Sequence, residues 1–306
     1  MKFKKIEYTH EDFERVRNFL MDTYKEKSSN WFIERWNWCV YFDGSWLEIL
    51  ETWPSSVGLW TDEKDNIVGL VSSQGEINGD VFFQLKETFC NAALANEMVD
   101  FAFNNLSVEE GGQSRLYPRL NKAHRHLFLN LFKNKGLSFS GITEKIATMN
   151  LHGLLQIDLP KGFKCINANQ FSAEERAVAH ARAFSDTDSK EVNLLNERTR
   201  AYKGLVSSVD YRPLFDVCIA DSSGQIAAFA TGWYDFQNNI GMLEPVGTIA
   251  SYRGNNLGKM VVYECMNRLY EVGVRKVYVG SGQEFYKSIG FEIVDEVEIW
   301  EPTQVL

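Results

Sequence analysis

The chain has 306 residues, of which 44% are hydrophobic and 24% are charged, and a formal net charge of -9. This length is enough for two domains of ordinary size, each with its own core. The negative charge repels polyanions, which argues against DNA or tRNA as a partner. Residues 1–13 lack the apolar segment of a signal peptide, and no apolar run has the length of a membrane span. We therefore expect a cytoplasmic protein that binds neither nucleic acid nor membrane.

The cysteines and histidines give no pattern of a metal centre. The five cysteines are widely spaced and odd in number, which fits neither a disulfide framework nor a zinc site. His124 and His126 have no cysteine or suitably spaced carboxylate beside them, so we predict a solvated helix start at this point. We expect reduced thiols and no bound metal.

The chain opens with a pattern that returns in its second half. Residues 3–6 and 163–166 share the sequence Phe-Lys-x-Ile and predict a short strand. A run with helical periodicity follows each strand, at residues 11–20 and 172–184. The repeated order of strand and helix indicates an internal duplication.

A later segment supports the duplication. Residues 66–71 and 224–229 each follow an acidic turn and predict a hairpin strand. The two copies meet in a linker that contains proline and glycine, at residues 154–162. We therefore predict two tandem domains, at residues 1–153 and 154–306.

The second copy predicts a mixed sheet with helices on it. In chain order we expect a strand, two helices, three strands, a helix, a strand, a short helix and a strand. These elements span residues 163–166, 172–185, 191–206, 215–220, 226–233, 240–248, 256–272, 276–279, 284–288 and 291–300. Antiparallel strands followed by one strand–helix–strand crossover give a mixed sheet. The predicted fold class is α/β, with a mostly antiparallel sheet and flanking helices in each domain.

The segment from Glu244 to Lys259 carries the clearest functional signal. An apolar strand pattern ends at Gly247 and Thr248, and a turn rich in Gly and Asn, beginning at Arg253, leads into an amphipathic helix. The amides of a first helical turn are unpaired, the helix dipole favours negative charge, and small residues allow a close approach. The segment therefore predicts a site for a pyrophosphate or a similar group.

The first copy lacks two features of the second. Its corresponding turn, at residues 85–91, contains no glycine, and Phe132 stands where the second copy has Tyr286. We therefore predict that nucleotide binding is confined to the second copy. The first copy would serve as a scaffold or as a wall of the acceptor site.

Residues 217–300 resemble the GNAT superfamily of acyl-CoA-dependent N-acyltransferases, in the tandem arrangement of mycothiol synthase-like proteins. The resemblance extends to the first half of the chain only because that half repeats the pattern of the second half. The family's phosphate loop has Arg or Gln, two residues, Gly, one residue, and Gly or Ala. Residues 253–258, RGNNLG, match this loop except that Asn256 stands where glycine is usual. Asparagine is the residue that best replaces glycine at positive φ.

The resemblance implies acetyl-CoA as the co-substrate. Backbone amides of the loop and the helix start would hold its pyrophosphate. A strand that splays from its neighbour would pair with its pantetheine amides, and Pro245, which has no amide, tolerates the break in the ladder. The predicted cofactor-binding residues are Val246, Gly247, Thr248, Arg253, Gly254, Asn255, Asn256, Leu257, Gly258 and Lys259.

Direct attack of an amine on a thioester requires a base and an acid. An alkyl amine with a pKa of ~10 is mostly protonated near neutrality, so a carboxylate should help to remove its proton. Glu244, at the end of the phosphate-loop strand, is our candidate, with Asp235 and Glu284 as lesser rivals. Tyr286 matches the family's tyrosine and is the candidate acid for the leaving thiolate.

These features predict an acetyl-CoA-dependent N-acetyltransferase that acts on a small-molecule or peptide amine. The alternative is a non-catalytic acyl-CoA-binding regulatory protein. An aromatic cluster at residues 31–46 either packs in the core or lines the acceptor cleft. The residue patterns identify neither the acceptor nor the oligomeric state.

Overall fold

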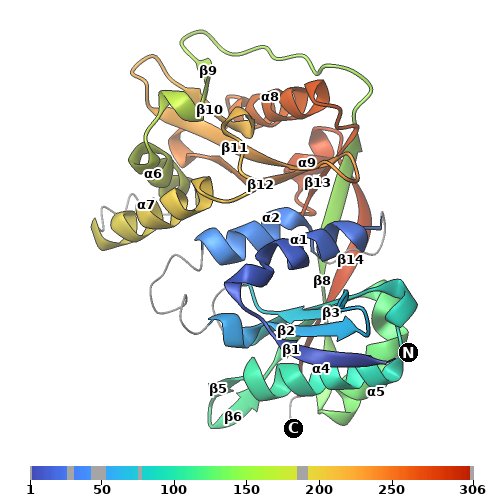
Figure 1. Ribbon diagram of the computed structural model, residues 1–306. Helices are drawn as coiled ribbons and strands as arrows, with labels where there is room; N and C mark the ends of the chain where they lie inside the picture. Colours follow the sequence, from blue (N-terminus) through green and yellow to red (C-terminus); the bar gives the residue numbers. More distant parts are fainter. Residues whose placement is uncertain (1, 26–30, 43–52, 75–77, 185–191, 304–306) are drawn as a thin grey trace.

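The structure, a computed structural model, describes residues 2–25, 31–42, 53–74, 78–184 and 192–303. In this part of the chain, twelve strands form one continuous mixed sheet, and helices pack on its faces (Figure 1). Most neighbouring strands are antiparallel, and the parallel pairs are β4 with β7 and β12 with β13. The predicted fold class is therefore confirmed.

The first half begins with the predicted strand and helix. Its helices and strands are β1 Phe3–Glu7, α1 Phe13–Asp22, α2 Ile33–Asn37, β2 Gly58–Asp62, β3 Ile67–Ser72, β4 Asp80–Leu85, α4 Ala92–Asn105, β5 Val108–Glu110, β6 Gln113–Arg115, β7 Tyr117–Asn121, α5 Arg125–Asn134 and β8 Leu137–Asn150. The strands β5 and β6 form a separate small hairpin.

The second half contains every element that its sequence predicts, within two residues at each end. These elements are β9 Lys164–Asn167, α6 Ala173–Phe184, α7 Val192–Val206, β10 Asp216–Ala220, β11 Ile226–Asp235, β12 Ile240–Thr248, α8 Leu257–Glu271, β13 Lys276–Val279, α9 Glu284–Ser288 and β14 Glu292–Pro302.

The two halves exchange their last strands. The order in the sheet is β1-β2-β3-β4-β7-β14-β8-β13-β12-β11-β10-β9. The final strand of the chain, β14, thus lies between β7 and β8 of the first half, and β8 lies between β13 and β14 of the second. The division at residues 153 and 154 stays a prediction about the chain, because in space each half includes a strand of the other.

Strand β12 separates from its neighbour part way along its length. It is parallel to β13 for three residue pairs, which end at Met242 and Tyr278. On its other side it pairs with β11 as far as Thr248, with a register shift between Ala230 and Gly232. Beyond Met242 the β13-facing edge of β12 is therefore open, as the resemblance to the GNAT superfamily implied.

Helix α8 is anchored on the sheet by one apolar stripe. Leu257, Val261, Cys265 and Leu269 are each at most 1% exposed and follow one another at every fourth position. This spacing places them on a single face, which packs against residues of β10–β12. Burial of one such aliphatic side chain stabilises the fold by roughly 1.5–3 kcal/mol. The stripe therefore fixes the N-terminus of α8 next to the end of β12.

Helices α1 and α2 attach the first half to the second. Met21 and Ile33 are buried in one cluster with Trp233 of β11. Beside this cluster, Arg17 Nε donates a hydrogen bond to Asp210 Oδ1 at 2.8 Å. Figure 1 shows these helices between the two halves, where α2 contacts β11.

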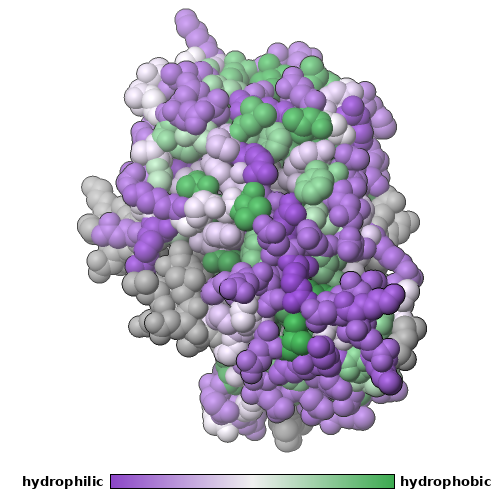
Figure 2. Space-filling view, in the orientation of Figure 1, coloured by the Kyte–Doolittle hydropathy of each residue, from purple (hydrophilic) through white to green (hydrophobic). Residues whose placement is uncertain are grey.

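The described helices and side chains give further limits. No helix within the described ranges combines the length and the apolar character that crossing a bilayer requires. All five cysteines are free. Within the same ranges, no three His, Cys, Asp or Glu side chains gather in a group that would hold a metal ion. Figure 2 shows a mainly hydrophilic lower half and hydrophobic residues interspersed over the upper half.

Candidate active site

A pocket of ≈ 860 Å³ opens beside the free edge of β12. This volume lies within the range of roughly 300–1,000 Å³ that is typical of small-molecule sites. Its walls come from β12, the turn before α8, the first turn of α8, and α9. Glu244 and Tyr286 line it together with nine of the ten predicted cofactor residues, namely Val246, Gly247, Thr248, Arg253, Gly254, Asn256, Leu257, Gly258 and Lys259. The tenth, Asn255, belongs to the same turn, and its side chain donates to Tyr252 O at 3.1 Å.

Two residues with positive φ shape the turn before α8. Gly254 has φ +82° and Asn256 has φ 59°. Asparagine enters this left-handed region at a lower cost than other residues with a side chain, so it serves where glycine is usual. Asn256 thus adopts the conformation that the sequence predicted for it.

The first amides of α8 are open. Among the described residues, no acceptor binds the N–H groups from Gly254 to Lys259, and the first helical hydrogen bond runs from Met260 N to Asn256 O at 3.1 Å. The Asn256 side chain makes no capping bond. The positive end of the α8 dipole therefore faces the pocket with unused donors.

The corresponding helix of the first half is closed. Asn91 Oδ1 accepts a hydrogen bond from Leu94 N at 3.1 Å and caps α4. Phe132, in the place of Tyr286, is fully buried beside Phe83 and Trp300. These contacts support the prediction that the first copy binds no nucleotide, which stays a prediction.

Arg253 anchors the phosphate turn through its side chain. Its Nε donates to Thr248 O at 3.2 Å, and its Nη2 donates to Ala183 O at 3.0 Å. The guanidinium thus ties the turn to the end of β12 and to the last turn of α6. This contact orients the backbone amides that follow Arg253.

Glu244 lies at the irregularity of β12. Its backbone carbonyl accepts a hydrogen bond from Trp233 Nε1 at 2.7 Å, which holds this part of the strand. The Glu244 side chain is exposed and lines the pocket. Desolvation by the protein atoms around it raises the pKa of Glu244, and the positive charge of Arg35 opposes the rise. A raised pKa makes the carboxylate a stronger proton acceptor.

Tyr286 lies on α9, belongs to the hydrophobic core and also lines the pocket. The ring packs against Phe285 and Phe291, with centroids 5.1 and 5.5 Å away, and the residue is 9% exposed. Burial raises the pKa of the hydroxyl, and the negative charge of Glu244 adds to the rise. Tyr286 is therefore protonated at neutral pH, and its pKa depends in part on the charge of Glu244.

The two rival carboxylates have structural partners. Asp235 is buried and accepts hydrogen bonds from the backbone of Gln237 and Asn238, which closes the turn after β11. Glu284 forms an ion pair with Lys287 at 2.6 Å. Neither residue is among those that line the pocket.

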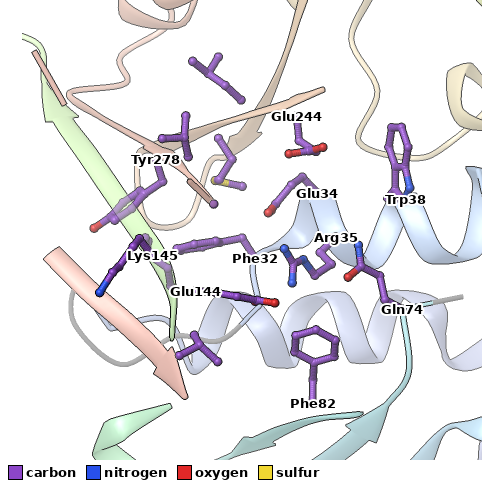
Figure 3. A pocket seen from close by; sticks show the side chains of 16 residues that line it. Phe32, Glu34, Arg35, Trp38, Gln74, Phe82, Glu144, Lys145, Glu244 and Tyr278 are labelled. Atoms are coloured by element: carbon purple, nitrogen blue, oxygen red, sulfur yellow. The ribbon is translucent and has the colours of Figure 1, made fainter. Parts of the chain in front are cut away.

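A second pocket adjoins the first and is lined from both halves of the chain. Glu244 and Gly280 line both pockets. The second pocket is smaller, with ≈ 90 Å³ of space. The first half contributes eight of the side chains labelled in Figure 3, namely Phe32, Glu34, Arg35, Trp38, Gln74, Phe82, Glu144 and Lys145.

The sequence analysis found only part of this second pocket. It left open whether the aromatic cluster packs in the core or lines a cleft, and the structure shows both. Trp31 and Trp36 are buried in the core, while Phe32 and Trp38 line the pocket. The charged residues between them were missed, because nothing in the sequence signals that α2 reaches β12.

A family model connects the second half to known proteins. Residues 174–291 match the model described as the acetyltransferase (GNAT) family. No curated protein sequence matches the chain at a significant level.

Solved structures match nearly the whole chain at low sequence identity. A GCN5-related N-acetyltransferase from Sphaerobacter thermophilus has a TM-score of 0.60 and 15% identity, over 98% of this chain and 95% of that one. A tandem GNAT protein from the clavulanic acid biosynthesis pathway has a TM-score of 0.59 and 11% identity, over 98% of each chain. The N-myristoyltransferase of Saccharomyces cerevisiae with bound myristoyl-CoA has a TM-score of 0.52 and 12% identity, over 98% of this chain and 78% of that one.

The structural matches establish the fold, and the family match shows what residues 174–291 are similar to. Both halves of the chain take part in the match to the tandem protein. The family model covers α6 through α9 and ends one residue before β14, so it includes the open helix end and both catalytic candidates. The chain therefore has the tandem GNAT fold, and its residues 174–291 match the model of the acetyltransferase (GNAT) family.

Proposed function

We propose that the chain is an acetyl-CoA-dependent N-acetyltransferase, with Glu244 as the base and Tyr286 as the acid. One observation carries the proposal. The open amides of α8, the free edge of β12 and the two candidate residues all meet in one pocket of ≈ 860 Å³. An anion site, a strand edge and an acid–base pair are what a pyrophosphate-bearing thioester requires.

The residues of the pocket fit such a co-substrate. The amides from Gly254 to Lys259 would bind its pyrophosphate at the positive end of the α8 dipole. The free edge at Val246, Gly247 and Thr248 would pair with its pantetheine amides in the manner of an added strand. When bound, acetyl-CoA supplies the activated acetyl group beside Glu244.

The chain's own residues then handle two protons. Glu244 removes a proton from the acceptor's ammonium group, which leaves a neutral amine to attack the thioester carbon. The C–N bond forms and the C–S bond breaks. Tyr286 donates its proton to the departing sulfur, and the proton released by the new amide nitrogen restores the hydroxyl. The acceptor in this proposal is an amine of a small molecule or a peptide.

The direct test mixes the protein with acetyl-CoA and a panel of primary amines and follows the release of free thiol. We expect turnover with at least one amine, and a loss of turnover in Glu244→Gln and Tyr286→Phe while CoA still binds. CoA binding without turnover of any primary amine would contradict the proposal. That result would favour the non-catalytic acyl-CoA-binding protein instead.

A further inference from the structure

The first half reaches the proposed active site through helix α2. Glu34 and Arg35 on this helix line the same small pocket as Glu244. A Cβ atom placed on Gly280, a residue shared by both pockets, would lie 3.7 Å from Arg35 Nη2. Figure 3 shows Glu34 and Arg35 on the side of the pocket that faces Glu244.

Glu34 is an unusual carboxylate. Its Oε2 atom is buried and has no hydrogen-bond partner within the described part of the chain. Burial raises the pKa of Glu34 to about 7, the charge of Glu244 adds to the rise, and Arg35 and nearby backbone amides oppose it. A buried acceptor without a partner is costly to a fold, so it indicates a position kept for something other than stability.

Most other charged groups around the pocket have partners of their own. Glu144 on β8 accepts from Arg119 Nε at 2.9 Å, and Lys145 pairs with Glu296. The Tyr278 hydroxyl, on β13, is hydrogen-bonded to another tyrosine. These three side chains are therefore already paired with other residues of the protein.

Three other charged side chains line the pocket and differ from these in their ion pairing. Glu34, Glu244 and Arg35 form no ion pair within 4.0 Å among the described residues. The Arg35 guanidinium lies over the ring of Phe82, 5.3 Å from its centroid. Two carboxylates and one guanidinium leave a surplus of one negative charge when all are ionised. The pocket is therefore complementary to a single added cation.

We propose that Glu34 is the second carboxylate of the active site, and that the acceptor's ammonium group binds between Glu34 and Glu244. This inference rests on the proposed acetyl transfer. It names the substrate class as a primary amine that is positively charged in solution. The space of ≈ 90 Å³ has room for about three waters at roughly 30 Å³ each, which suits an ammonium group with a few carbons on it. Phe32 and Trp38 flank this space and suit an aliphatic stem.

The proton balance of binding follows from the pair. Below about pH 7 Glu34 holds a proton, and the pocket is neutral overall. The arriving ammonium displaces that proton to solvent and restores the ionised form. The carboxylate pair then takes one proton from the ammonium before the nitrogen attacks. The affinity for the amine should therefore rise as the pH increases through about 7.

The kinetic test compares three variants loaded with acetyl-CoA, using the best amine of the panel. Glu34→Gln removes the charge at constant size, and Glu34→Asp keeps it. Glu109→Gln removes a charge from the exposed strand β5 and serves as the control. We expect Glu34→Gln to raise KM for the amine about tenfold or more and to remove the rise of kcat/KM near pH 7. CoA affinity should stay unchanged, and Glu34→Asp should recover part of the loss.

The opposite outcome is clear. An unchanged KM and an unchanged pH profile in Glu34→Gln would overturn the proposal, although the acetyl transfer itself would stand. The control is expected to match the wild type in both quantities.

A second measurement does not require turnover. Carbon NMR of the glutamate carboxyl groups in the CoA complex gives the titration midpoint of Glu34. We expect a midpoint near 7 that falls in Glu244→Gln and falls on addition of 1,4-diaminobutane, but not of 1,4-butanediol. A titration midpoint near 4.5, the ordinary pKa of glutamate, that does not change on addition of the diamine would overturn the proposal. The expected titration without acetylation of any amine would support the amine site and contradict the acetyl transfer.

Discussion

Replacement of Glu34 by glutamine is expected to stabilise the protein, and to do so more at alkaline pH than at acidic pH. The carboxyl group has a pKa of about 7 in the folded protein against 4.5 for an ordinary glutamate. The folded state therefore keeps a proton that the unfolded chain releases as the pH rises from 4.5 to 7. Across this window the wild type loses stability, because ionising Glu34 costs more in the fold than in water.

The size of the effect follows from the same two values. The difference between 4.5 and about 7 corresponds to about 3 kcal/mol of unfolding free energy at pH values above 7. At about pH 5 most of this loss has not yet occurred, and the cost is about 1 kcal/mol. Glutamine has no proton to lose, so the gain from Glu34→Gln should grow by about 2 kcal/mol between pH 5 and pH 8.5.

Urea unfolding at about pH 5 and about pH 8.5 measures this gain directly. Glu109→Gln is the matched control, because it makes the same change of charge at an exposed position of β5. The control should show the same unfolding free energy as the wild type at both pH values. A gain in Glu34→Gln that is equal at both values, or a loss at pH 8.5, would refute the reasoning about the buried carboxylate.

Four substitutions at three other positions test the phosphate turn and the acid. Gly258→Asp should abolish CoA binding as measured by calorimetry. The new carboxylate would face the bound phosphates, and its Cβ atom would lie 3.0 Å from Thr248 Oγ1. An unchanged CoA affinity, with an intact circular-dichroism spectrum, would contradict the assignment of the phosphate loop. Tyr286→Phe should lower kcat by about a hundredfold with CoA affinity unchanged, and a normal kcat would show that another group protonates the sulfur. Asn256→Gly should keep CoA affinity within about threefold of the wild type. Asn256→Val should weaken CoA affinity about tenfold, since a β-branched residue is strained at φ 59°. Equal CoA affinities of the two variants would show that the turn does not need a residue in the left-handed conformation.

The second half could be predicted from the sequence because its signals are local. The turn at Gly254 and Asn256 lies between an apolar strand and a helix whose buried residues recur at every fourth position. Each of these features is set by residues a few positions apart. The same locality explains why the open helix end and its contrast with the first copy were expected.

The strand exchange and the second carboxylate depend on contacts between residues far apart in the sequence. The pattern of β14 is satisfied equally by a place beside its own copy or inside the other, and only the folded sheet shows that it pairs with β7. Glu34 and Arg35 lie on a short polar stretch amid aromatic residues, more than two hundred positions before Glu244. Their approach results from the packing of Ile33 against the second half. A single sequence contains no periodicity that would report it.

The central claim is that the amides following Arg253 bind a diphosphate. A crystal structure of the protein with bound CoA tests it most directly. We expect pyrophosphate oxygens within hydrogen-bond distance of the amides from Gly254 to Lys259, with the pantetheine chain along the free edge of β12. CoA bound at another place, such as the capped start of α4, would contradict the account.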